Sequence, residues 1–233
     1  MSHTTLVCLG FAGAGASFFH PWREIAPDGI DVLAPQLPGR EWRFEEEPAA
    51  DIGAAADLLL PEVAAEVAGR RVALLGQCFG AALAFELALR LSDVDGVELV
   101  HLFPSGSPSP WTRRPVLAAG LDDDELVRRV REDIGYDHEA LAEPELRELI
   151  IPALRADMES HEKYVAARDA RLDVPVTALR GRTDPVVSTD EAGEWARATT
   201  AAFTLVEFDG AHMYLADEPA ALLALVARAV TPA

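Results

Sequence analysis

The chain has 233 residues, 50% of them hydrophobic, and a formal net charge of −19. This charge argues against nucleic acid as a partner, because such binding depends on lysines and arginines that displace phosphate counterions. Two cysteines give no disulfide framework, and a chain of this length buries enough surface to need neither a disulfide nor a structural metal. We expect one domain over residues 1–233, a monomer, with no cofactor and no metal ion.

The first residues, Met1 to Thr5, lead directly into a short apolar run and do not resemble a signal peptide. No apolar run reaches the ~20 residues that a membrane-spanning helix requires. We therefore expect a cytoplasmic protein without membrane contacts.

Strand-like and helix-like segments alternate along the chain, which is typical of a parallel sheet covered by helices on both faces. The fold class predicted is therefore α/β, with a mostly parallel sheet. Strands are predicted over residues 5–9, 31–34, 72–75, 97–103, 175–180 and 203–208. Helices are predicted over 16–26, 50–68, 80–91, 190–198 and 217–229.

Residues 105–169 interrupt this alternation, because their apolar residues recur only at helical spacing, as in Leu126, Val127, Val130 and Ile134. An all-helical insertion between two strands predicts a lid over a substrate pocket, with the proline-rich entrance as a hinge. Trp111 is a candidate wall of that pocket. The alternative is an ordinary helical excursion that packs on the edge of the core.

The segment Gly76-Gln77-Cys78-Phe79-Gly80 lies directly between a predicted strand and a predicted helix. It has the pattern of a nucleophile elbow, in which a tight turn requires small flanking residues and exposes the central side chain. A helix N-terminus also favours the ionised thiolate of Cys78. The alternative is an inert buried cysteine, which is the more common fate of a cysteine and the one expected for Cys8.

A base and an acid follow the elbow in the order that this architecture requires. Asp184 and His212 each lie on a loop after a predicted strand, at the sheet edge where ligands bind. Taken singly, each residue is equally compatible with a surface loop or a turn. Asp190 is the nearest rival acid and is predicted to be a helix N-cap instead. The other histidines fall in the terminus, in a strand or in helices: His3, His20, His101, His138 and His161.

Two backbone amides are expected to hold the oxyanion formed when a carbonyl is attacked. The first is that of Phe79, directly after the nucleophile. The second comes from the glycine-rich loop after the first strand, from Phe11 or Ala12. A phosphate-binding role for this loop is disfavoured, because it has neither dinucleotide-binding nor P-loop spacing.

These motifs, together with the run Ala34-Pro35-Gln36-Leu37-Pro38-Gly39-Arg40-Glu41, resemble the type II thioesterases of polyketide and nonribosomal peptide synthesis. The resemblance covers nearly the whole chain. It implies an α/β-hydrolase fold with a lid, and an activity on acyl groups carried as thioesters on the phosphopantetheine arm of an acyl or peptidyl carrier protein.

Two departures from the family pattern stand out. Members usually have serine at the position of Cys78, and Pro-His-Ala-Gly-Gly where this chain has Gly10-Phe11-Ala12-Gly13-Ala14. An acyl-cysteine is itself a thioester, which amines attack more readily than an ester. Cys78 therefore permits transfer to an amine or hydroxyl, or cyclising release, besides the hydrolysis that we expect first. A non-catalytic carrier-binding module is a third alternative, and a cysteine introduced in place of a native serine would give the same sequence.

An acidic carrier would be repelled by this acidic chain at long range, so docking requires a local basic patch. The candidates are Arg113 with Arg114, and Arg128 and Arg129 with Arg131. The alternative is that these arginines pair with the acidic residues at 122–125 on a solvated helix face.

Overall fold

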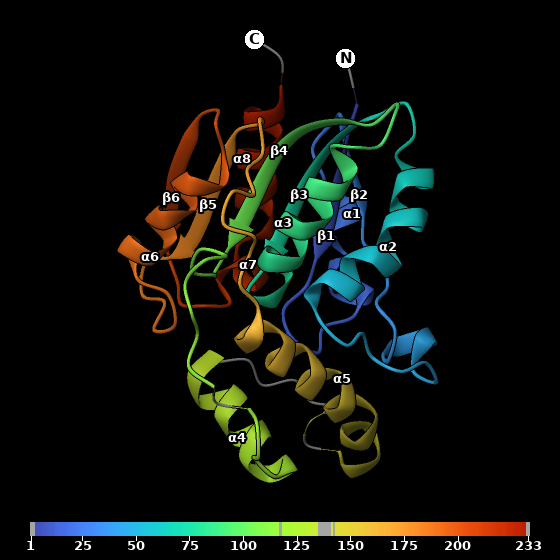
Figure 1. Cartoon of the computed structure of the whole chain (residues 1–233), viewed down its shortest axis with the longest axis vertical. Helices are drawn as coiled ribbons and strands as arrows, with labels where there is room; N and C mark the ends of the chain where they lie inside the picture. The colour runs from blue at the N-terminus through green and yellow to red at the C-terminus, as the bar shows by residue number, and fades with distance from the viewer. Residues whose placement is uncertain (1–2, 117, 135–140, 142, 232–233) are drawn as a thin grey trace.

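A six-stranded sheet, in the order β2-β1-β3-β4-β5-β6, forms the centre of the protein, and every neighbouring pair of its strands is parallel (Figure 1). The structure, a computed structural model, describes residues 3–116, 118–134, 141 and 143–231. The strands are β1 (Thr4–Leu9), β2 (Ile30–Leu33), β3 (Arg71–Gln77), β4 (Glu98–Ser105), β5 (Val176–Gly181) and β6 (Phe203–Phe208).

The central strands are apolar without alternation because both of their faces are covered. All six residues of β1 and all six of β5 are buried, and in β3 only Arg71 is partly exposed. Continuous apolar runs are characteristic of parallel strands between two helical layers. The predicted strands and the predicted parallel α/β architecture are confirmed, and the ends of the strands differ by at most two residues.

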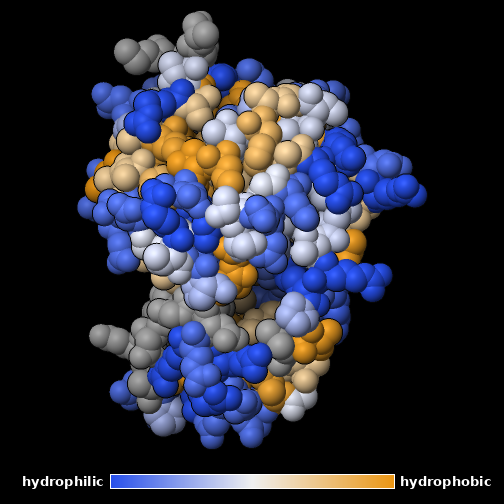
Figure 2. Space-filling view, turned by 90° about the vertical axis from the view of Figure 1, so that its left-hand side faces the viewer, coloured by the Kyte–Doolittle hydropathy of each residue, from blue (hydrophilic) through white to orange (hydrophobic). Residues whose placement is uncertain are grey.

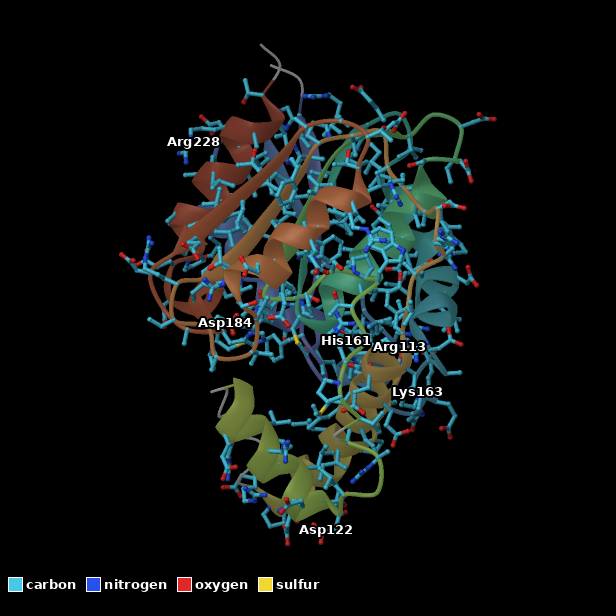
Figure 3. All side chains as sticks on the ribbon, turned by 60° about the vertical axis from the view of Figure 1, so that its left-hand side comes forward. Arg113, Asp122, His161, Lys163, Asp184 and Arg228 are labelled. Atoms are coloured by element: carbon cyan, nitrogen blue, oxygen red, sulfur yellow. The ribbon has the colours of Figure 1, made fainter. Side chains whose placement is uncertain are left out.

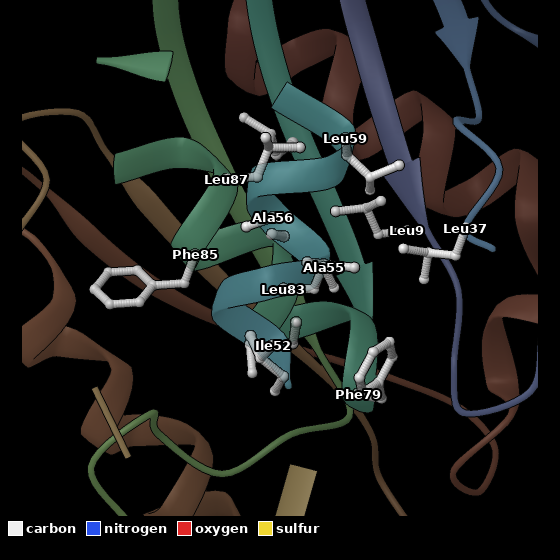
Figure 4. Close-up of a cluster of buried hydrophobic side chains, with 14 of the residues drawn as sticks. Leu9, Leu37, Ile52, Ala55, Ala56, Leu59, Phe79, Leu83, Phe85 and Leu87 are labelled. Atoms are coloured by element: carbon white, nitrogen blue, oxygen red, sulfur yellow. The ribbon is translucent and has the colours of Figure 1, made fainter. Parts of the chain in front are cut away.

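Helices cover both faces of the sheet and create a core cluster on each. One cluster joins the sheet to α2 and α3, and Figure 4 shows Ile52, Leu59, Leu83 and Leu87 at this contact. The other joins the opposite face to α1, α7 and α8. The helices are η1 (Ala16–Phe19), α1 (Trp22–Ile25), η2 (Glu41–Arg43), α2 (Ile52–Glu66), α3 (Phe79–Leu91), α4 (Asp123–Ile134), α5 (Pro144–Lys163), α6 (Thr189–Gly193), η4 (Glu194–Ala198), α7 (Tyr214–Asp217) and α8 (Pro219–Val230).

Two predicted helices are divided in the structure. The segment 16–26 forms η1 and α1, with Pro21 as the N-cap of α1. The segment 190–198 forms α6 and η4. The predicted helix 217–229 corresponds to α8, and the short helix α7 before it was not predicted. The N-cap of α6 is Ser188 rather than Asp190, because the Ser188 hydroxyl accepts a hydrogen bond from the Glu191 amide and the Glu191 carboxylate accepts one from the Ser188 amide. A serine followed three residues later by a glutamate is the sequence signature of this capping box.

The segment between β4 and β5, residues 106–175, contains α4 and α5, and we call it the helical insertion. Figure 1 shows both helices below the ends of the strands, outside the layers that sandwich the sheet. In Figure 2 the surface is hollowed where this region meets the body, and the lower part of the molecule carries hydrophilic residues beside a hydrophobic patch. The helical insertion therefore lies on the side to which the carboxyl ends of the strands point.

The strand order reverses direction between β1 and β3, because the chain passes from β1 outward to β2 and then returns to β3 on the other side. Loops after two such strands separate and leave a crevice at the carboxyl edge, which is where ligands bind in open α/β sheets. The loop after β1 and the turn after β3 are the predicted oxyanion loop and the predicted elbow.

Candidate active site

Cys78 occupies a strained backbone conformation between β3 and α3, with φ 55° and ψ −113°. Among the described residues other than glycine, only Glu41 and Cys78 have a positive φ. Such a conformation persists only where the surroundings enforce it, and it is typical of functional sites. Here the Cys78 amide donates to the Ser105 carbonyl at 2.8 Å, and its carbonyl accepts from the Ala81 amide at 3.0 Å. The backbone geometry is that of a nucleophile elbow.

The two glycines of the elbow are required by close backbone contacts. A Cβ atom at Gly76 would overlap the carbonyl of Gly80, and a Cβ atom at Gly80 would overlap the carbonyls of Leu9 and Gly10. The second contact also presses the elbow against the start of the loop after β1. The sequence prediction that both positions must lack a side chain therefore has a steric explanation in the structure.

The two thiols lie in different environments, and neither forms a disulfide. The Cys8 side chain is inside the core, 1% exposed, where burial raises its pKa. Cys78 is also buried, with 9% of its surface exposed, and not open to solvent as the elbow pattern predicted; it precedes the N-terminus of α3. Cys8 is thus a core residue, whereas Cys78 lies at the elbow on the carboxyl edge of the sheet.

His212 and Asp184 meet beyond the ends of β6 and β5, as the sequence predicts. The Nδ1 atom of His212 donates to the Oδ2 atom of Asp184 at 2.9 Å. The other carboxylate oxygen of Asp184 accepts from the amides of Val186 and Val187, at 2.7 and 3.2 Å. Both side chains of the pair are 0% exposed. Asp184 is therefore fixed by its own loop and in turn fixes the tautomer and orientation of the imidazole.

The Nε2 atom of His212 is buried and makes no hydrogen bond to a described residue. Burial alone would lower the pKa of His212, but Asp184 and Cys78 act in the opposite direction and raise this pKa to about 10. The thiol of Cys78 is therefore an electrostatic neighbour of the ring, and the imidazolium is favoured beside it. The arrangement is compatible with that of a nucleophile, a base and an acid.

A buried chain of hydrogen bonds, which the sequence analysis did not identify, fixes the His212 loop. Tyr214 donates to Ser105 at 2.6 Å, Ser105 donates to Gln77 at 2.5 Å, and the Gln77 side chain donates to the His212 carbonyl at 2.8 Å. The chain joins the ends of β3 and β4 to the loop after β6. Gln77 immediately precedes Cys78. A polar side chain at the end of an apolar strand is the sequence signal that could have identified it.

The loop after β1 is braced by the Pro-Gly-Arg-Glu run, for which the sequence suggested no role beyond family resemblance. The Gln36 side chain accepts from the Ala16 amide at 2.9 Å, and Glu41 accepts from the Ser17 hydroxyl at 2.5 Å. Arg40 donates to the Ala14 carbonyl at 3.3 Å. This motif therefore shapes the loop that is expected to supply an oxyanion donor.

Asp157 of α5 binds the same loop from the side of the helical insertion. Its Oδ2 atom accepts from the Gly13 amide at 2.8 Å and from Arg40 at 2.6 Å, while its Oδ1 atom accepts from Arg40 at 3.0 Å. Both partners of this ion pair are nearly buried, with side-chain exposures of 5% and 7%. Asp157 was not predicted from the sequence. The signal that could have identified it is its spacing from Leu154, which places a charge on the apolar face of the helix.

A cavity of about 590 Å³ lies between the loop after β1, the Arg40 region and the helical insertion. Its walls are mostly apolar side chains and glycines: Phe11, Ala12, Gly13, Ala14, Gly15, Ser17, Phe18, Pro21, Arg40, Glu41, Phe44, Val130, Leu141, Leu146, Leu149, Ile150 and Leu154. The two candidate second oxyanion donors, Phe11 and Ala12, are both in this wall. The cavity thus adjoins the predicted oxyanion loop, whereas Cys78, Phe79, Asp184 and His212 are not among its lining residues.

Trp111, the predicted pocket wall, does not line this cavity. Its ring packs against Phe85 and lies beneath the guanidinium groups of Arg171 and Arg197, and its indole nitrogen donates to the Ala167 carbonyl. Trp111 thus joins the helical insertion to the body. A tryptophan with cationic neighbours finds stacking partners there that an acyl chain would not replace.

Two of the arginines proposed for docking, Arg114 and Arg128, are engaged within the protein. Arg114 turns inward and donates to the Ser107 hydroxyl at 2.9 Å and to the Pro108 carbonyl at 3.3 Å. Arg128 pairs with Glu125 and Glu132 on its own helix, as the alternative interpretation expected. His138 lies outside the described residues.

No cluster of three or more His, Cys, Asp or Glu side chains suited to a metal ion occurs in the described part of the chain. Over the same residues, no helix is both long enough and apolar enough to cross a membrane.

Known proteins resemble this chain in sequence and in fold. A family model described as "Thioesterase domain" matches residues 4–229. The chain is 34% identical over 227 residues to the "Probable cadicidin biosynthesis thioesterase" of Streptomyces griseus, covering 97% of this chain and 62% of that protein. It is 34% identical over 217 residues to thioesterase PikA5 of Streptomyces venezuelae, covering 93% of this chain and 77% of the relative.

Among solved structures, the type II thioesterase BorB from the borrelidin biosynthetic cluster superposes with a TM-score of 0.89 at 37% identity, covering 98% of this chain and 93% of that one. The predicted α/β-hydrolase fold is thereby confirmed. The chain belongs to the thioesterase family and, within it, resembles the type II enzymes of polyketide and nonribosomal peptide pathways.

Proposed function

We propose that this chain releases acyl groups from the phosphopantetheine arm of a carrier protein through an acyl intermediate on Cys78. The observation that carries the proposal is the strained elbow at Cys78 together with the buried His212–Asp184 pair, whose Nδ1–Oδ2 distance is 2.9 Å. The similarity to thioesterases of polyketide pathways supports this class of substrate.

In the first half of the reaction, the Cys78 thiolate attacks the thioester carbonyl. The amides of Phe79 and of Phe11 or Ala12 hold the oxyanion. The carbon–sulfur bond to pantetheine then breaks, and the departing thiolate takes the proton from Nε2 of His212. In the second half, His212 removes a proton from water as it attacks the acyl-cysteine, and returns that proton to the Cys78 sulfur as the acid leaves. Asp184 stabilises the imidazolium at both stages.

The cavity beside Phe11 and Ala12 is the proposed site for the acyl chain, with the helical insertion as its lid. Val130, Leu146, Leu149, Ile150 and Leu154 supply the apolar surface on the insertion side. Of these, Leu146 is 47% exposed and Leu149 is 50% exposed, which leaves apolar area for an acyl chain to cover. Residues 105–169, the lid segment expected from the sequence, include both helices that contribute to this wall.

Transfer of the acyl group to an amine or hydroxyl is the second candidate, and the sulfur of Cys78 is the observation that favours it. Passing an acyl group from pantetheine to cysteine exchanges one thioester for another and preserves its reactivity. An ester on serine would not preserve that reactivity. Hydrolysis remains the first candidate because the similar proteins are named as thioesterases.

Intact-mass measurement on a carrier protein loaded with an acyl group tests both candidates. The expected result is loss of the acyl mass from the carrier, a transient acyl adduct on the peptide that contains Cys78, and free acid as product. A product bearing an added amine would instead support transfer. If the carrier retains its acyl group in both cases, the enzymatic proposal is wrong and a non-catalytic carrier-binding role is favoured.

A further inference from the structure

His161, in the last turn of α5, lies against the elbow from the side of the helical insertion. Its ring meets the Phe79 ring edge to face, with the centroids 6.1 Å apart, and its side chain is 8% exposed. The carbonyl of His161 accepts from Arg114 at 3.5 Å. In Figure 3, His161 and Asp184 lie at the same level, where the helical insertion meets the end of the sheet. His161 is thus a neighbour of the site to which neither the comparisons nor the mechanism gives a role.

The imidazole of His161 is neutral at neutral pH. Burial lowers its pKa well below the ordinary value, and the charges of Arg114 and His212 lower it further. These are the two cations whose fields reach the ring, one from the loop after β4 and one from the loop after β6. A neutral imidazole keeps one nitrogen that donates a hydrogen bond and one that accepts.

The Nε2 atom of His161 is buried and has no hydrogen-bond partner among the described residues. A buried polar atom without a partner costs about 1–3 kcal/mol, so such atoms need an explanation. A leucine or methionine would fill this space beside Phe79 without that cost. The polar nitrogen is therefore best explained by a group that enters the site with the substrate.

We propose that His161 is a specificity residue that hydrogen-bonds, through Nε2, a neutral polar group of the acyl chain close to the thioester carbonyl. The inference rests on the proposed thioesterase function and names its substrate class as acyl groups with a hydroxyl or carbonyl near the reacting carbon. The closeness to the carbonyl follows from the contact with Phe79, whose amide is the expected oxyanion donor.

The positive charges around His161 favour neutral substituents of the acyl chain over cationic ones. Arg114 and the imidazolium of His212 would repel an ammonium group held at Nε2, whereas a hydroxyl or carbonyl carries no such penalty. Hydroxyacyl and oxoacyl groups are therefore favoured over aminoacyl groups.

The test compares three pantetheine thioesters that differ only at the third carbon: butyryl, 3-hydroxybutyryl and 3-aminobutyryl. Thiol release gives kcat/KM for each with the wild type, His161→Leu, His161→Gln and the exposed control Lys163→Leu on the same helix. We expect the wild type to prefer 3-hydroxybutyryl over butyryl about tenfold, the effect of one hydrogen bond, and to use 3-aminobutyryl least. His161→Leu should use 3-hydroxybutyryl no better than butyryl, His161→Gln should retain part of the preference, and Lys163→Leu should behave as the wild type does.

Each other outcome overturns the inference. Equal wild-type rates on the hydroxyl and unsubstituted substrates, or a preference for the amine, would exclude the proposed contact. An equal loss of rate on all three substrates in a folded His161→Leu variant would assign the residue to the chemistry instead of to specificity. If the wild type releases no thiol from any of them, while a loaded carrier is also untouched, it is the thioesterase proposal that fails.

Discussion

Asp157 of helix α5 and Arg40 of the loop after β2 form a buried ion pair with two hydrogen bonds, at 2.6 and 3.0 Å. The same carboxylate binds the Gly13 amide in the loop after β1. One side chain of the helical insertion is thus part of the structure that shapes the proposed oxyanion loop. The position of α5 and the geometry of the catalytic edge are therefore coupled.

Replacing Asp157 with Asn tests this coupling. We expect a loss of about 3–5 kcal/mol in the free energy of unfolding, because the Arg40 guanidinium remains buried without its counter-charge. A lower kcat should accompany it, since the Gly13 amide is less firmly held. Glu159→Gln, on the same helix, removes an exposed pair with Lys163 and should cost less than about 1 kcal/mol. Denaturant unfolding and thiol-release kinetics measure both effects, and similar behaviour of the two variants would contradict the coupling.

The identity of the nucleophile can be separated from its placement with two substitutions at position 78. Cys78→Ala should form no acyl adduct and should lower kcat by about 10³-fold or more. Cys78→Ser should form an ester, retain hydrolysis, and release less product to an added amine than the wild type does. Mass spectrometry of the enzyme detects the acyl adduct, and mass spectrometry of the products with and without the amine gives the amine-to-water ratio. An unchanged amine-to-water ratio in the serine variant would show that the sulfur does not determine the acceptor.

The Asp184–His212 pair predicts a definite pH dependence of stability. The pKa of His212 is raised to about 10, whereas in the unfolded chain it is close to 6.5. The stability that this shift confers is fully present below pH 6.5 and is lost as the pH rises through 10. Asp184→Asn keeps an oxygen for the Val186 and Val187 amides but removes the charge. The difference in unfolding free energy between wild type and this variant should therefore be largest near pH 6 and shrink toward pH 10. A difference that grows over this range would contradict the assignment.

Gly80 gives a steric prediction with a matched control. A methyl group there meets the carbonyls of Leu9 and Gly10, so Gly80→Ala should cost about 1–3 kcal/mol and misplace the elbow, lowering kcat. Gly193→Ala adds the same methyl group at a site with nothing within 4 Å and should change stability by less than about 1 kcal/mol. Thermal unfolding and activity measurements on the two variants test the predicted difference between them. Equal stability would show that the elbow relaxes freely.

The sheet, the elbow and the positions of Asp184 and His212 could be predicted from the sequence because their signals are local. A continuous apolar run identifies a strand buried on both faces, and the glycines two residues before and two residues after Cys78 identify a turn. Asp184 and His212 follow from their positions after strands, since parallel strands bring their carboxyl ends to one edge. These predictions need no knowledge of which side chains meet.

The remaining features depend on contacts between distant segments. Trp111 is apolar enough to line a pocket, but only the fold shows that the guanidinium groups of Arg171 and Arg197 stack on its ring. The partners of Asp157 lie 117 and 144 residues away in sequence. His161 lies in a helix, where the sequence gives no sign of a functional role, and only its neighbours Phe79 and Arg114 make it a candidate for substrate contact. No pattern within a short window encodes such pairings.

The elbow holds its central residue by backbone hydrogen bonds and by the absence of side chains at Gly76 and Gly80, so the conformation does not depend on whether sulfur or oxygen occupies the tip. Serine and cysteine codons can differ by a single base. A lineage with this scaffold can therefore exchange an ester intermediate for a thioester one in one mutational step, without first having to refold its catalytic edge.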